Sequence, residues 1–233
     1  MKKTLFIASV ILIIACSNKV KHDDNKTTKS DVKLSAVDPS ISLDECIERL
    51  NSKYELEEFL FLAEQFQGNK DSDKTLKWIP LYYASYCLIE ASFLETNPET
   101  RDKLIDKAQV ILDKCLEIDP KESELYTLQG YLFQARLNVS PMFRGSAMSK
   151  KAHAEFRKAS ELNPNNPRPA YLEALGLYYA PKMFGGGKDN AYPLFKKAKE
   201  QYDNWSSEIL YFPSWGEDNN LSKLKDCESS LNL

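Results

Sequence analysis

The sequence predicts an all-α protein, built of repeated helical hairpins behind an export signal and a polar tether. Apolar residues recur with the 3.6-residue period of a helix from about residue 41 to the C-terminus, without the alternation typical of strands. Prolines and capping residues stand where helices would begin and end. One helix pattern recurs three times, which indicates a structural repeat. We therefore expect eight or nine helices.

Residues 1–15 are predicted to be a lipoprotein signal peptide. A basic start, MKK, precedes an apolar run from Leu5 to Ala15 that is shorter than the roughly 20 residues of a membrane span. Its end, IIACS, resembles the lipobox of bacterial lipoproteins, which implies that Cys16 is acylated and begins the mature chain. By resemblance to the sorting rule of double-membraned bacteria, the serine after it implies the outer membrane. No strongly acidic surface-export tag follows the cysteine, which favours the periplasmic face. The alternative is an ordinary secretory signal with a chance cysteine.

Residues 16–40 are predicted to be the lipidated cysteine and a disordered tether. From Ser17 to Ser40 the chain has five lysines, four aspartates and no aromatic residue, so it cannot bury enough apolar surface to fold. Without residues 1–15 the chain has a net charge of −5, from 29 basic and 34 acidic residues. A mildly acidic chain without a basic stripe is not expected to bind nucleic acid.

Residues 41–73 are predicted to form N-terminal capping helices, over 43–50 and 55–66. Ser42 and Glu45 have the spacing of a capping box at the first of these. Thr96 and Glu99 have the same spacing before a later helix, whose first turn would hold Pro98.

Residues 74–203 are predicted to hold about three degenerate repeats. Each has a helix with the spacing small-x3-large-x2-small, which places three side chains on one face, where the small ones let a neighbouring helix approach. The three sets are Ala108, Leu112 and Cys115; Ala152, Phe156 and Ala159; and Ala191, Phe195 and Ala198. Prolines follow the first two of these helices, at 120 and 164.

This spacing resembles the second helix of the tetratricopeptide repeat. Tyr126, Gly130 and Phe133 match the first helix of that repeat, and the residues at 172, 176 and 179 match it again. The resemblance implies a right-handed α-α superhelix of stacked hairpins. Residues 204–233 would then form the C-terminal cap, with Trp215 anchoring a turn and a last helix from Leu221 to Leu231.

The resemblance also implies a concave groove that holds a peptide or protein partner. Tyrosines suit such a surface because they bury a large area and keep a hydrogen-bonding tip. Core packing is the alternative for each of them. The residues that would point into the groove are Tyr83, Tyr86, Tyr131, Gln134, Glu173 and Leu177.

A Pro-Met-Phe element with a following glycine recurs between the two helices of two repeats, at 141–145 and 181–185. Its recurrence predicts a bend in which glycine reverses the chain and, in the second copy, Asp189 caps the next helix. The glycines do not form a P-loop, because Lys182 and Asp189 stand where glycine and serine or threonine are needed. The bends are an alternative site for a small ligand. Its residues would be Phe143, Arg144, Phe184, Gly185, Gly186, Gly187 and Lys188.

No catalytic group, cofactor or metal site is expected. The only histidines, His22 and His153, lie in polar surroundings, and no catalytic motif or marked carboxylate pair is present. The chain is therefore not expected to be an enzyme. The other four cysteines are expected to be buried thiols, with disulfide pairing left open: Cys46, Cys87, Cys115 and Cys227.

The sequence thus favours a membrane-anchored envelope scaffold that binds a protein in its groove. The alternative is a lipoprotein that captures a glycan or a small anion at the glycine-rich bends. A purely structural envelope component is the third possibility, and the partner itself is not identified.

Overall fold

The structure is a computed structural model that describes residues 38, 41–52, 54–69 and 75–233. The predicted signal peptide and Cys16 lie outside these residues, as does nearly all of the tether. The described residues are helices and connections, with no strand among them, so the predicted all-α class is confirmed. In chain order the elements are α1 (Leu43–Leu50), α2 (Leu56–Gly68), α3 (Trp78–Leu94), α4 (Pro98–Ile118), α5 (Ser123–Val139), α6 (Pro141–Leu162), α7 (Arg168–Tyr179), the 3₁₀ turn η2 (Lys182–Phe184), α8 (Lys188–Tyr202) and α9 (Glu217–Leu231).

Local capping sets the starts of two of these helices. The backbone N–H of Glu45 donates to Ser42 Oγ at 3.1 Å, so α1 is capped as predicted. The prediction of Thr96 as the cap of α4 is wrong by one residue. Asn97 precedes the first helical residue, Pro98, and accepts the N–H groups of the next two residues at 3.0 Å each.

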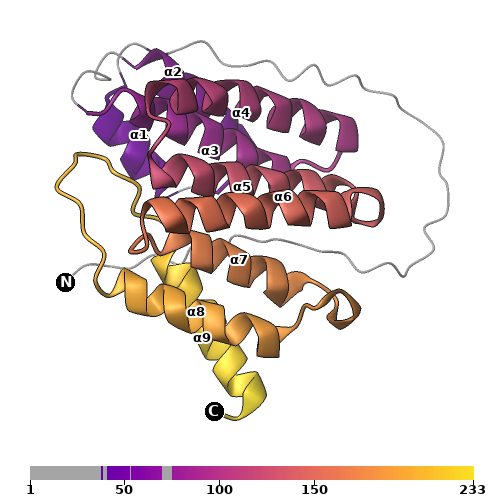
Figure 1. Cartoon of the computed structure of the whole chain (residues 1–233). Helices are drawn as coiled ribbons and strands as arrows, with labels where there is room; N and C mark the ends of the chain where they lie inside the picture. Colours follow the sequence, from indigo (N-terminus) through magenta and orange to yellow (C-terminus); the bar gives the residue numbers. More distant parts are fainter. Residues whose placement is uncertain (1–37, 39–40, 53, 70–74) are drawn as a thin grey trace, which may run out of the picture.

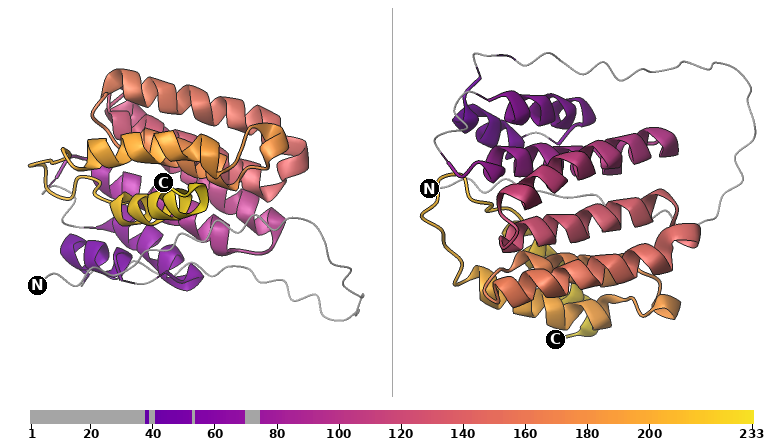
Figure 2. Two further views of the ribbon diagram at one scale, coloured as in Figure 1. Left: turned by 90° about the horizontal axis from the view of Figure 1, so that it is seen from below. Right: turned by 45° about the horizontal axis from the view of Figure 1, so that its top comes forward.

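Three helical hairpins follow one another along the molecule: α3 with α4, α5 with α6, and α7 with α8 (Figures 1 and 2). α1 and α2 pack before the first hairpin, and α9 packs on α8 after the last. The first helices also contact one another in order, α3 with α5 and α5 with α7. They form the inner face of the stack, and no described helix is long and apolar enough to cross a membrane.

The recurring small-x3-large-x2-small residues lie in the core, as the spacing predicts. All nine are at most 3% exposed. Gly130 of α5 shows why a small residue is needed, because a Cβ atom at this position would overlap the ring of Phe156 from α6. The close approach of the two helices is therefore set by a glycine facing a phenylalanine.

The two Pro-Met-Phe elements have different backbones. At the α7–α8 bend, Gly185 and Gly187 have φ values of 79° and 120°, as the predicted chain reversal requires. At the α5–α6 bend the helix already begins at Pro141, so Gly145 is helical and the predicted reversal there is wrong. Asp189 is not the cap of α8 either, because Gly187 holds that place and Asp189 lies in the first turn.

Candidate functional site

Four apolar side chains project into solvent at the α5–α6 and α7–α8 bends. Met142 and Phe143, in the first turn of α6, are 92% and 91% exposed. Met183 and Phe184, in η2, are 82% and 74% exposed. We call these four residues the tip. Large apolar groups this exposed, at two successive bends of the stack, mark a candidate binding surface.

Both parts of the tip lie at one edge of the molecule, where the first helices end (Figure 1). Gln134 of α5 donates to the carbonyl of Leu172 at 2.8 Å, and its Nε2 would lie 2.9 Å from a Cβ placed on Gly176. α5 and α7 thus run side by side at this level. Each ends within five residues of it, and a Pro-Met-Phe element follows.

The α7–α8 half of the tip is a tightly constrained loop. The N–H of Gly187 donates to Leu177 O at 2.8 Å, and the N–H of Gly186 to Pro181 O at 3.1 Å. Asn190 Nδ2 donates to Gly185 O at 3.0 Å. A Cβ at Gly186 would overlap the backbone of Ala180, so only glycine allows this packing. Met183 and Phe184 are therefore presented by a fixed backbone.

Three cations surround the tip, and two of them are already paired. Arg144 makes a bidentate ion pair with Asp102 at 2.5 and 2.8 Å, and this hydrogen bond lowers the pKa of the Asp102 carboxyl. Lys188 lies 2.7 Å from Asp226, whose pKa it lowers in the same way. The side chain of Lys182 is 81% exposed and reaches Asp189 only at 4.0 Å. Lys182 is thus the most available of the three for an anionic ligand.

The predicted concave groove is filled by the chain itself. Residues 203–216 connect α8 to α9, and we call this segment the strap. The Trp215 ring of the strap lies 5.0 Å from Tyr86, 6.1 Å from Tyr131 and 6.3 Å from Tyr171, between ring centroids. These tyrosines belong to α3, α5 and α7, one from each hairpin. Tyr83, Tyr86 and Tyr131 are all buried, so they offer no open surface here.

The other predicted groove residues are partly buried and lie away from Trp215's ring contacts. Gln134 is used in the α5–α7 contact described above. Glu173 Oε1 lies 2.8 Å from His153 Nδ1, and this hydrogen bond raises the pKa of the histidine. Leu177 packs against the core, and its carbonyl supports the tip loop. The structure does not bring the six residues together on one exposed surface.

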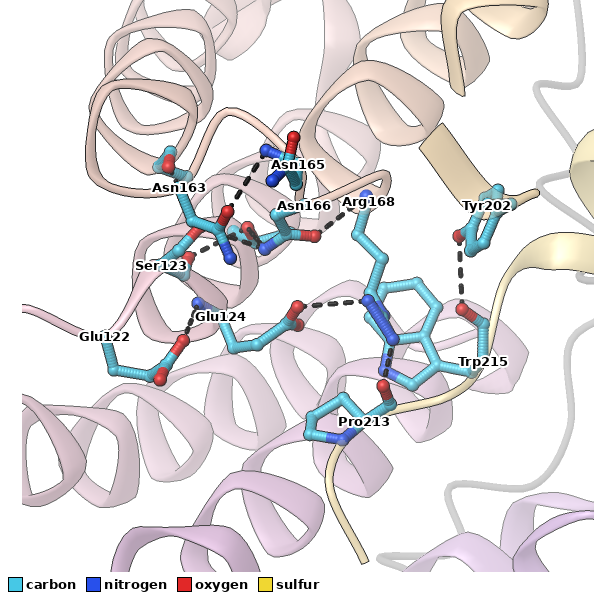
Figure 3. A network of polar contacts seen from close by, with 12 residues as sticks. Glu122, Ser123, Glu124, Asn163, Asn165, Asn166, Arg168, Tyr202, Pro213 and Trp215 are labelled. Atoms are coloured by element: carbon cyan, nitrogen blue, oxygen red, sulfur yellow. Dashed lines mark hydrogen bonds and ion pairs between the residues drawn. The ribbon is translucent and has the colours of Figure 1, made fainter. Parts of the chain in front are cut away.

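A buried ion pair beneath the strap was not predicted from the sequence. Arg168 Nη1 lies 3.0 Å from Glu124 Oε1, and both side chains are fully buried (Figure 3). The other terminal nitrogen of Arg168 donates to the carbonyl of Pro213 in the strap. Its guanidinium also lies 5.3 and 5.6 Å from the rings of Trp205 and Trp215. Nothing in the local pattern around Arg168 distinguishes it from an exposed residue of a helix start.

A second buried carboxyl, Glu90 of α3, lies on the same inner face. Its Oε1 accepts a hydrogen bond from the Tyr131 hydroxyl at 2.7 Å. Burial raises the pKa of Glu90 to about 7, although hydrogen bonds from Tyr131 and Tyr86 partly oppose the shift. Glu90 is thus a titratable group in a region made mostly of rings.

A shallow groove on the outer side, of about 710 Å³, lies between α4, α5 and α6. Its aromatic side chains, Tyr126 and Phe133, already make cation–π contacts with lysine side chains. The ammonium of Lys158 is 3.9 Å from the centre of the Tyr126 ring, and that of Lys151 is 5.4 Å from the centre of Phe133. These rings are less available than those of the tip.

Comparison with known proteins gives one informative match. No protein-family model matches the chain, and no curated protein does either. Among solved structures, the HusA haemophore from Porphyromonas gingivalis is similar, with a TM-score of 0.68 and 30% sequence identity. The match covers 80% of this chain and 91% of that one. Membership of the tetratricopeptide repeats stays a prediction. The chain belongs to the same family as the HusA haemophore.

Proposed function

We propose that this protein binds a porphyrin, haem above all, at the tip. The observation that carries the proposal is the recurrence of an exposed Met-Phe pair at two adjacent bends, 74 to 92% exposed. The family relation supports the ligand class, since the related protein is a haemophore. Ligand binding by the bends was the alternative function predicted from the sequence, with a different ligand.

The chemistry of the tip suits a flat apolar ring with charged edges. Phe143 and Phe184 offer ring faces or edges for stacking, which contributes about 0.5–1.5 kcal/mol per ring pair beyond the area buried. Met142 and Met183 add polarizable thioethers that adapt to a flat surface. A thioether is also one of the groups that ligate haem iron. Lys182 can pair with a carboxylate at the edge of the ring.

The other two surfaces are less suitable. The inner face is covered by Trp215, which contacts a tyrosine of each hairpin. In the outer groove, a porphyrin would first have to displace the ammonium groups of Lys151 and Lys158 from the rings. The tip needs no such displacement.

The test is a titration of the full chain, in detergent, with haemin and separately with metal-free protoporphyrin IX, followed by absorbance of the porphyrin. The variant is Phe143→Ala with Phe184→Ala, and the matched control is Val110→Ala, which truncates an exposed apolar residue of α4. Losing two ring contacts should cost about 1–3 kcal/mol, which corresponds to roughly 5- to 150-fold weaker binding. The control should bind like the wild type.

Comparison of the two ligands separates ring stacking from iron ligation. If Met142 or Met183 ligates the iron, the corresponding Met→Leu variant will weaken haemin binding and leave protoporphyrin binding unchanged. Absence of binding by the wild type would refute the function. Binding that is unaffected in the double variant but lost in Phe133→Ala would keep the function and move the site to the outer groove.

A further inference from the structure

The strap lies on the inner face in the manner of a bound peptide. Phe212 packs edge-on against Trp78 of α3, with ring centroids 5.7 Å apart. Three residues later, Trp215 lies among tyrosines of three helices, and its Nε1 donates to Tyr82 Oη at 2.9 Å. Between them, the carbonyl of Pro213 accepts from the buried Arg168. Figure 3 shows Trp215 and the contact of Pro213 with Arg168. Together with Phe212, two aromatic anchors and one backbone contact thus hold an irregular segment to a helical surface.

The fit between strap and helices is imperfect, unlike that of the core. Tyr211 has a φ of 60°, which is unfavourable for a residue with a side chain. Three buried polar atoms at this contact find no hydrogen-bond partner among the described residues: Arg168 Nε, Trp78 Nε1 and Tyr54 Oη. A cavity of about 20 Å³ is lined in part by Tyr54 and Trp215. Unsatisfied polar atoms and strain both favour a segment that can leave.

Little holds the strap from the outside. Ile209 and Leu210 are 42% and 49% exposed, and most of residues 203–210 are exposed as well. Within the described part of the chain, hydrogen bonds from Thr75 Oγ1 to Leu210 O, at 2.6 Å, and from Tyr211 Oη to Asp44 Oδ1, at 2.7 Å, join this part to the N-terminal region. Among the described residues, opening the strap would therefore break few contacts outside the groove.

We propose that the strap is a removable occupant of a peptide-binding groove, and that the open groove binds an extended partner segment of the same chemistry. Such a segment carries an aromatic residue and, three positions later, a tryptophan. A backbone carbonyl between them accepts from Arg168. The proposal is independent of porphyrin binding at the tip, since the two sites share no residue.

The first test supplies the strap sequence as a separate peptide. A fluorescent peptide with the sequence of residues 208–218, EILYFPSWGED, is titrated against three full chains: wild type, Trp215→Ala and Ile209→Ala. Trp215→Ala removes the main anchor of the strap, whereas Ile209→Ala changes only its exposed part and serves as the matched control. We expect Trp215→Ala to bind the peptide at least ~10-fold more tightly than the other two, measured by fluorescence anisotropy. A peptide with alanine in place of its tryptophan should not bind. A folded Trp215→Ala chain that ignores the first peptide would overturn the proposal.

The second test needs no variant, and it decides the matter if Trp215→Ala fails to fold. Hydrogen exchange of the Trp215 indole N–H is followed in the wild type at increasing low concentrations of urea, together with amides of α3 and α5. Opening of the strap alone exposes little surface, so the indole should exchange at a rate that urea hardly changes. Exchange of the indole only with global unfolding, in step with the helices, would show that the strap is part of the core and refute the proposal.

Discussion

Replacing Glu90 by glutamine should remove a pH dependence of stability that this single carboxyl creates. Glu90 is 7% exposed, and its carboxyl accepts hydrogen bonds from the neutral hydroxyls of Tyr131, at 2.7 Å, and Tyr86. A buried carboxylate without a cationic partner favours its protonated form, so the pKa rises to about 7 from the usual 4.5. Glutamine has the same shape and retains an acceptor oxygen, but it does not ionise.

The sign and the size follow from the difference in pKa between the folded and unfolded states. Because the folded protein binds this proton more tightly, the associated stability is fully present below the unfolded pKa of about 4.5. It is lost progressively as the pH rises to about 7. At 1.36 kcal/mol per pKa unit, the loss amounts to about 3 kcal/mol. This is a large part of the total stability expected of a domain of this size.

The assay is urea unfolding at pH 5 and pH 8 for the wild type, Glu90→Gln and the exposed control Glu117→Gln. Between the two pH values the wild type and the control should lose about 2–3 kcal/mol more than Glu90→Gln. All other titrating groups, including Glu124, contribute equally to the three proteins and cancel in the comparison. If Glu90→Gln loses as much stability as the wild type, the burial argument for this carboxyl is wrong.

Three further predictions concern glycines of the fold and the predicted lipid anchor at Cys16. Gly130→Ala should destabilise the fold by about 1–3 kcal/mol in urea unfolding, because the new methyl overlaps the ring of Phe156; an unchanged midpoint would contradict this. Gly186→Ala should weaken haemin binding, because the new methyl would overlap the backbone of Ala180 and the loop that holds Met183 and Phe184 would change its conformation. Gly145→Ala should leave binding intact and stabilise α6 by about 0.5–1 kcal/mol, because this glycine is helical with open space around it; equal effects of both variants would refute the role given to the loop. Cys16→Ser should move the protein from the membrane pellet to the soluble fraction, and persistence after a carbonate wash would count against the anchor.

The helical hairpins were predictable because the signals that specify them are local. These signals involve residues within one or two helical turns, so they can be recognised without knowing the rest of the fold. Examples are the cap Ser42 and the spacing Ala152-x3-Phe156-x2-Ala159. The error at the α5–α6 bend is also local in origin. Both bends share Pro-Met-Phe and a glycine, but only the α7–α8 bend has the further glycines at 186 and 187 that its loop requires.

The groove was not predictable in the same way, because its state depends on contacts between distant parts of the chain. Trp215 meets Tyr86, Tyr131 and Tyr171, which are separated from it by 129, 84 and 44 positions. The ion pair of Arg168 with Glu124 likewise spans 44 positions. The periodicity of apolar residues within one helix carries no information about contacts between residues so far apart in the sequence. The resemblance to repeat proteins with open grooves predicted an open groove here. In the structure, the strap of this chain fills that groove.

The strap and the tip together explain how an aromatic-rich chain distributes its rings. The rings of the inner tyrosines pack against Trp215, and Tyr82 and Tyr131 also use their hydroxyls in buried hydrogen bonds. The inner face, which other repeats leave open, therefore exposes little apolar surface. The tip shows the opposite arrangement, since its rings and thioethers are 74 to 92% exposed, and those of Met183 and Phe184 stand on a loop constrained by its glycines. The glycines at 185 to 187 let the α7–α8 bend project outward, with Met183 and Phe184 exposed on it. A bend built outward in this way gains nothing for folding, and a ligand is the simplest physical reason for it.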